Sequence, residues 1–219
     1  SEVEERQVIC RLLQAMDIDI LDLEKRLKEN SRNSTEELLQ YVLFEIQSPI
    51  EDYFLAVDIL TDNYFKNRDI RLAILGAYLS STWLSFKENR FLELLDEHLS
   101  EADDQNKAII WYLHAYDMYI RCDGKYPREY SDYLQKSISH SKRFVYNYVR
   151  LSEVSEKSKA RALLDRAISN IETVWTEEQL KKVPKTVFLK YENFIDEFIL
   201  GVDISIFEYK DLIAKRELL

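Results

Sequence analysis

The scarcity of glycine and proline limits what this chain can fold into more than any other feature of its sequence. Its 219 residues contain only three glycines and three prolines. A fold made mainly of strands needs frequent tight turns, and these two residues supply most of them. The sequence therefore predicts an all-α fold.

Polar and turn-forming residues mark where the expected helices begin and end. Ser34 followed three residues later by Glu37 predicts a capping box at one helix start. Asp123-Gly124 with Pro127 predicts the clearest break in the chain, because glycine and proline both end helices. The expected helices cover 35–47, 49–65, 67–86, 89–99, 104–121, 128–140, 142–153, 158–175, 177–182, 184–200 and 205–215.

Two of these helices are apolar on more than one face. In the helix expected over 104–121, Trp111 and Met118 lie on one stripe, and Tyr112 and Tyr116 lie on a neighbouring one. The helix expected over 67–86 has the same character. Neighbours must cover such helices on several sides, so the sequence predicts layers of antiparallel helical hairpins.

Three segments carry related residues at matching steps. They are Leu72, Leu75, Gly76 and Leu79; Trp111, His114, Ala115 and Met118; and Phe144, Asn147, Tyr148 and Leu151. The second and third sets are 33 residues apart, and Ala160, Leu164 and Ala167 follow at second-helix spacing. These segments resemble tetratricopeptide (TPR) repeats, whose period is 34 residues. The resemblance implies a TPR-like right-handed α-solenoid of stacked antiparallel hairpins, with a groove that takes a peptide or helix.

We expect two regions along the chain. Residues 1–30 form an N-terminal amphipathic helical segment, and residues 31–219 form a helical-hairpin repeat domain with its repeat-like core at 68–175. Apolar residues in the first region recur at steps of four and three. They are Ile9, Leu13, Met16, Ile20, Leu23 and Leu27. This N-terminal stripe predicts either a capping helix that packs on its own domain or a dimer helix, which would make the protein a homodimer.

The charge is negative and unevenly distributed. The formal net charge is −10, and residues 1–106 carry 23 acidic against 11 basic side chains, whereas residues 107–219 carry 17 against 19. An acidic chain repels phosphate backbones, so direct nucleic-acid binding is disfavoured. A basic partner or a charged peptide fits better.

Cysteine usage and hydropathy predict a cytoplasmic protein that does not enter the membrane. Cys10 and Cys122 have neither metal-site nor redox-motif spacing. No apolar run approaches the roughly 18 residues of a membrane span, and the first residues are charged, unlike a signal peptide.

No local motif predicts catalysis, a cofactor or a metal. Three scattered glycines cannot supply a phosphate loop or a dinucleotide fingerprint. His98, His114 and His140 lack zinc-site spacing, and the acidic stretch around Asp96 to Asp104 lacks the order of a calcium loop. We therefore expect a protein that is not an enzyme.

A basic segment contains the predicted binding residues. Arg143, Asn147 and Arg150 are spaced to form one polar stripe on the helix expected over 142–153, opposite Phe144. The planar guanidinium group of arginine can donate two hydrogen bonds to a carboxylate, so these residues suit an acidic peptide. The alternative is that these residues only form the solvated face of a repeat helix.

The leading hypothesis is a non-catalytic protein- or peptide-binding module that uses a groove between stacked helices. One alternative is the sensor domain of a peptide-responsive bacterial transcription regulator, separated from its DNA-binding domain. Another is an immunity or inhibitor protein that covers a basic effector with its acidic half.

Overall fold

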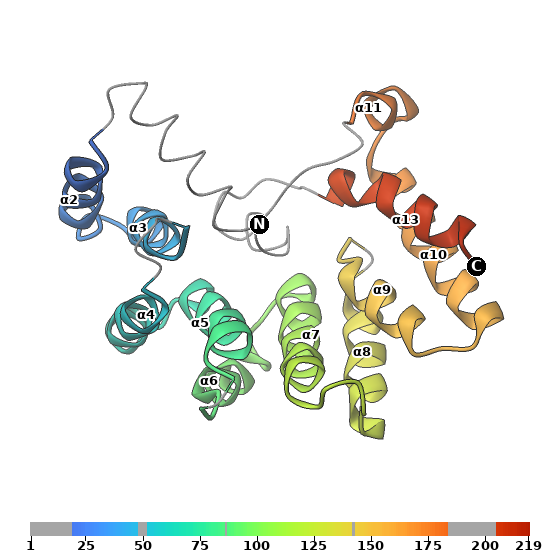
Figure 1. The fold of residues 1–219 in the computed structure, drawn as a ribbon, viewed down its shortest axis with the longest axis horizontal. Coiled ribbons are helices and arrows are strands. Elements are labelled where there is room, and N and C mark those ends of the chain that lie inside the picture. Colours follow the sequence, from blue (N-terminus) through green and yellow to red (C-terminus); the bar gives the residue numbers. More distant parts are fainter. Residues whose placement is uncertain (1–18, 48–51, 86, 142, 184–204) are drawn as a thin grey trace. The chain divides into compact units, whose positions relative to one another are not determined.

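The protein is helical throughout the part that the structure describes. The computed structural model describes residues 19–47, 52–85, 87–141, 143–183 and 205–219. These ranges contain 11 α-helices and one short 3-10 helix but no strand, so the all-α prediction is confirmed (Figure 1). The elements are α2 (Ile20–Asn30), α3 (Thr35–Gln47), α4 (Tyr53–Asn67), α5 (Ile70–Trp83), α6 (Arg90–His98), α7 (Asp104–Arg121), α8 (Arg128–His140), α9 (Tyr146–Glu153), α10 (Lys157–Val174), α11 (Glu177–Lys182), η1 (Ser205–Glu208) and α13 (Tyr209–Glu217).

The helices pack as neighbouring pairs within two compact units. Unit 1 is Ser1–Leu84 and unit 2 is Ser85–Leu219. In unit 1, α3 packs against α2 and α4, and α4 packs against α5. In unit 2, each helix from α6 to α9 contacts the next one along the chain, and α10 also packs against α13. The boundary between the units falls inside 68–175, the range predicted to hold the repeat-like core.

Polar side chains and a left-handed turn set the helix ends. The Ser34 hydroxyl accepts the backbone N–H of Glu37 at 3.1 Å, which places the start of α3 where it was predicted. Aspartate side chains cap α2, α4, α5 and α7 in the same way, through Asp19, Asp52, Asp69 and Asp103. After α7 the chain turns through Asp123 and Gly124, whose φ angles are 45° and 81°, at the predicted break.

α9 begins four residues later than the predicted helix start at residue 142. The Ser141 hydroxyl accepts the backbone N–H of Arg143 at 3.2 Å, and this local bond competes with helical hydrogen bonding. Phe144 and Val145 are buried before the helix starts at Tyr146. Phe144 and Val145 therefore belong to the loop before α9 and not to its first helical turn.

The two helices predicted to be apolar on more than one face, α5 and α7, contribute many of the buried residues. In α5 every residue from Leu72 to Ser81 is buried, as expected for a helix covered on several faces. In α7, Tyr112 and Tyr116 are buried, whereas Trp111 remains half-buried. Large aromatic side chains thus occupy central positions in unit 2.

Candidate functional site

The three residues predicted to bind a partner do not share one exposed helix face. Arg143 is exposed but lies before α9, Asn147 in the first turn of α9 is 0% exposed, and Arg150 is half-buried. The expected stripe assumed that a polar residue opposite Phe144 faces solvent. Asn147 instead finds hydrogen-bond partners inside the protein, so the side chains separate. Whether any of them binds a partner stays a prediction.

Asn147 belongs to a buried polar contact between three helices. Its side-chain amide donates to the Ser137 hydroxyl on α8 at 2.9 Å, and its side-chain carbonyl accepts the N–H of Tyr148 at 2.7 Å. The Ser137 hydroxyl in turn donates to the backbone carbonyl of Ala108 on α7. Buried polar groups are costly unless they are hydrogen-bonded, so this contact fixes α7, α8 and α9 against one another.

Arg150 is held by aromatic side chains of α7. Its guanidinium carbon lies 3.9 Å from the centre of the Tyr119 ring, and its Nε donates to the Tyr112 hydroxyl at 3.5 Å. Glu153 lies 3.9 Å away on the next turn of α9. The Arg150 side chain is only 17% exposed. These contacts give Arg150 a clear structural role at the junction of α7 and α9.

A ladder of stacked tyrosines continues from this junction. Ring centres are 6.3 Å apart for Tyr116 and Tyr119, 5.8 Å for Tyr119 and Tyr126, and 4.4 Å for Tyr126 and Tyr130. Burial raises the pKa of Tyr130 well above its ordinary value, so its hydroxyl stays protonated at any physiological pH. The spacing of the α7 tyrosines predicted packing, but nothing in the sequence indicated their pairing with Tyr126.

A second aromatic cluster joins α7 to α8 on another side of α7. The Trp111 and Tyr133 rings stack with centres 5.8 Å apart, and the Lys136 ammonium lies 4.5 Å from the centre of the Trp111 ring. His114 stacks on Tyr133 and contacts Asp96 of α6 through Nε2 at 2.7 Å. His114 is therefore an interhelical residue.

The N-terminal stripe is only partly within the described residues. Ile9, Leu13 and Met16 lie outside them. Ile20, Leu23 and Leu27 are half-buried on α2, which packs against α3. The choice between a capping helix and a dimer helix stays open.

Unit 1 contains a buried carboxyl group that sequence reasoning missed. Glu45 on α3 is 1% exposed and forms hydrogen bonds with Tyr41 and with Glu24 of α2. Burial, together with the negative charges of Glu24 and Asp52, raises the pKa of Glu45 to about 7. The group is therefore protonated in mildly acidic solution, when it can donate a hydrogen bond inside the protein.

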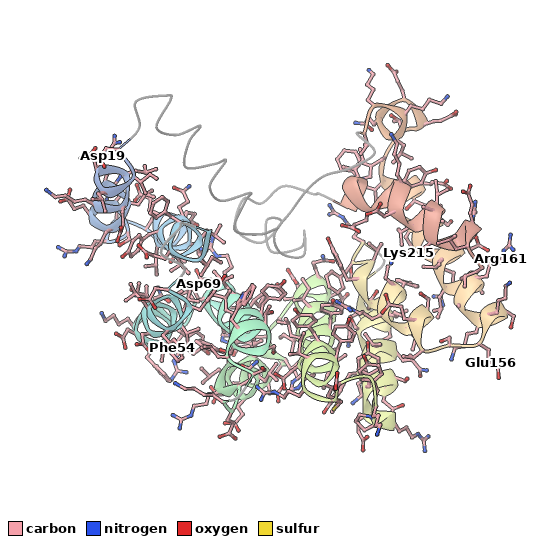
Figure 2. All side chains as sticks on the ribbon, viewed as in Figure 1. Asp19, Phe54, Asp69, Glu156, Arg161 and Lys215 are labelled. Carbon is pink, nitrogen blue, oxygen red and sulfur yellow. The ribbon has the colours of Figure 1, made fainter. Side chains whose placement is uncertain are left out.

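Among the described residues, the most exposed aromatic side chains lie on α4. Phe54 and Phe65 are 49% and 56% exposed, although both are large apolar side chains. Figure 2 shows Phe54 projecting from α4. Their separation of 11 residues is close to three helical turns, which places both rings on one line along the helix. The exposed side chains of Asp58 and Asp62 lie between them on the same side of α4. We call these four residues the α4 outer face.

Comparison with protein families, curated proteins and solved structures gives no match. Function must therefore be inferred from the surfaces of this chain. The α4 outer face differs from the two aromatic clusters of unit 2, because about half of the surface of each of its two phenylalanines is exposed. Solvent-exposed aromatic rings on a helix are typical of partner-binding surfaces.

Neighbouring contacts hold the two ends of the α4 outer face in place. Tyr53, directly before Phe54, stacks on Trp83 of α5 with ring centres 4.5 Å apart and an interplanar angle of 12°. At the other end, the guanidinium carbon of Arg68 lies 5.4 Å from the centre of the Phe65 ring. The helix that carries the two phenylalanines is thus preorganised.

Within the described residues, no group of three or more His, Cys, Asp or Glu side chains could hold a metal ion. None of the described helices combines the length and the apolar character needed to span a bilayer.

Proposed function

We propose that this protein is a non-catalytic protein-binding module of TPR-like stacked hairpins, arranged as a right-handed α-solenoid. Two features support the architecture: helices packed as neighbouring pairs in each unit, and the 33-residue interval between Trp111 and Phe144. A crystal structure would test it directly. A superhelix of the opposite hand, or hairpins that do not stack, would contradict the proposal.

The α4 outer face is the proposed binding surface, and the exposure of Phe54 and Phe65 is the observation that carries this choice. Burying one phenylalanine side chain is worth about 1.5–3 kcal/mol, so two such anchors can supply much of a moderate affinity. The predicted groove residues fit this role less well, because Asn147 is buried and Arg150 is held by Tyr119.

Site-specific photo-cross-linking in the native cells tests this surface. Leu55 is 38% exposed beside Phe54, and replacing it with p-benzoylphenylalanine leaves both phenylalanines and both aspartates in place. The exposed Ala162 on α10 is the matched control position. We expect a protein adduct at Leu55 that is absent at Ala162 and is lost when Phe54 and Phe65 become alanine. Identical adducts at both positions would contradict the proposal.

A specific observation favours one of the alternative functions within this class. Asp58 and Asp62 make the α4 outer face acidic, which suits an immunity or inhibitor protein that covers a basic effector. The same surface could serve that role without any change to its geometry. The sensor-domain hypothesis stays a prediction.

A further inference from the structure

The α4 outer face has two acidic positions between two apolar ones. Along α4 the order is Phe54, Asp58, Asp62 and Phe65, at steps of four, four and three residues. With a rise of 1.5 Å per residue, the two rings are about 16 Å apart along the helix axis. Two apolar anchors therefore flank a central pair of carboxylates.

The two carboxylates are available to a partner. Both aspartates are exposed, and in the described part of the chain neither forms an ion pair with a basic side chain. A cationic partner group brought between the two phenylalanines would exclude water around the carboxylates, and this strengthens the attraction. The two phenylalanines would shield those ion pairs from water.

Resting on the proposed function, we propose that the α4 outer face binds a basic amphipathic helix of a partner protein. The complementary helix carries two apolar side chains about 16 Å apart, with lysine or arginine on the same face between them. On a partner helix this corresponds to apolar positions i and i+11 with basic positions near i+4 and i+7. Such a pattern matches the α4 outer face in both spacing and charge.

A second copy of this chain fits the surface poorly. In a two-fold antiparallel pairing of α4 with itself, Phe54 would meet Phe65, but Asp58 would meet Asp62 of the other copy. Like charges in contact oppose that arrangement. An anionic membrane or a nucleic acid is disfavoured for the same reason, since its phosphates would approach the two carboxylates.

The partner segment captured by the Leu55 cross-linker tests this inference. Mass spectrometry of the adduct identifies the cross-linked peptide, and we expect a segment with positive charge between apolar residues at helical spacing. The charge-reversed variant D58K/D62K should lower the adduct yield at least tenfold. The variant E129K/D132K changes the net charge equally on exposed positions of α8, and its yield should stay within twofold of the wild type.

Three outcomes would overturn the inference alone: an adduct with an acidic or neutral segment, an adduct with a second copy or with lipid, or equal yields for the two charge-reversed variants. In a cell lysate, raising the salt concentration from 50 to 500 mM should also reduce the adduct, because salt screens the attraction between the acidic surface and a basic partner before they meet. The absence of any adduct specific to Leu55 would overturn the proposed function itself, and the two failures are thereby distinguished.

Discussion

The guanidinium carbon of Arg150 lies 3.9 Å from the centre of the Tyr119 ring. The contact joins α9 to α7 across a junction that also contains the Tyr112 hydroxyl. A planar cation over an aromatic face is attracted by the ring's electron density, and partial burial strengthens the interaction. Arg150 therefore stabilises the helix packing of unit 2, whatever else it contacts.

Replacing Arg150 with alanine should lower the free energy of unfolding by about 1–2 kcal/mol, because the contacts with Tyr119 and Tyr112 are lost. Arg150→Lys should recover less than half of this, since an ammonium group cannot stack as a plane. Arg161→Ala is the matched control at an exposed position of α10 (Figure 2), with an expected change within about 0.5 kcal/mol. Urea unfolding followed by circular dichroism measures the free energy of unfolding of all three variants. Equal changes for Arg150→Ala and Arg161→Ala would show that the contact with Tyr119 does not contribute to stability.

Asn147→Ala should cost about 2 kcal/mol of stability, because the buried Ser137 hydroxyl and the Tyr148 N–H each lose a partner. Ser137→Ala should also destabilise the protein. The stability loss of the double variant should be smaller than the sum of the two single losses, because both residues belong to one hydrogen-bonded contact. Thermal unfolding of the four proteins gives the coupling energy, and strict additivity would contradict a shared contact.

Glu45 should make stability depend on pH. Its pKa in the folded protein is raised to about 7, above the ordinary value of about 4.3 expected in the unfolded chain. As pH rises between these values, the unfolded state loses its proton first, so stability falls and then levels off above about pH 7. Glu45→Gln should remove this dependence. Relative to the wild type, the free energy of unfolding of the variant should be higher by on the order of 2 kcal/mol at pH 8 and almost unchanged at pH 4.5.

Denaturant midpoints measured from pH 4.5 to 8 give this comparison. The exposed Glu93 of α6 provides a control, because Glu93→Gln should leave the pH profile unchanged. A Glu45→Gln profile parallel to that of the wild type would contradict the raised pKa.

The α4 outer face should contribute little to folding. Phe54→Ala and Phe65→Ala should each change the free energy of unfolding by less than about 1 kcal/mol, because both side chains remain about half exposed. Leu60→Ala on the buried side of the same helix should cost about 2–5 kcal/mol. Thermal unfolding provides the comparison. Losses at Phe54 or Phe65 as large as that at Leu60 would assign the rings to the core and remove the basis for a binding surface.

Local features of the fold could be predicted because they depend on neighbours in sequence. The cap at Ser34 involves a backbone group three residues away, and the turn at Asp123 and Gly124 depends on φ angles that few residues adopt. The burial of α5 from Leu72 to Ser81 was predicted from apolar residues that lie on more than one face of the expected helix. Such properties need no knowledge of which helix supplies the contact.

The candidate site could not be predicted in the same way. Helical periodicity placed Asn147 beside Arg143 and Arg150 on an outward stripe, but the Ser137 hydroxyl of α8 draws Asn147 inside. Conversely, periodicity gave no reason to leave Phe54 exposed.

The amino-acid sequence by itself determined that this protein is helical, where its clearest break lies and which helices must be covered on several sides. Only the tertiary structure decided which polar groups are buried with partners, as Asn147 and Glu45 are, and which aromatic rings stay about half exposed, as Phe54 and Phe65 do. The physical reason is that helix formation depends on residues within one or two turns. Burial depends on the helix that packs opposite, and that helix comes from elsewhere in the chain.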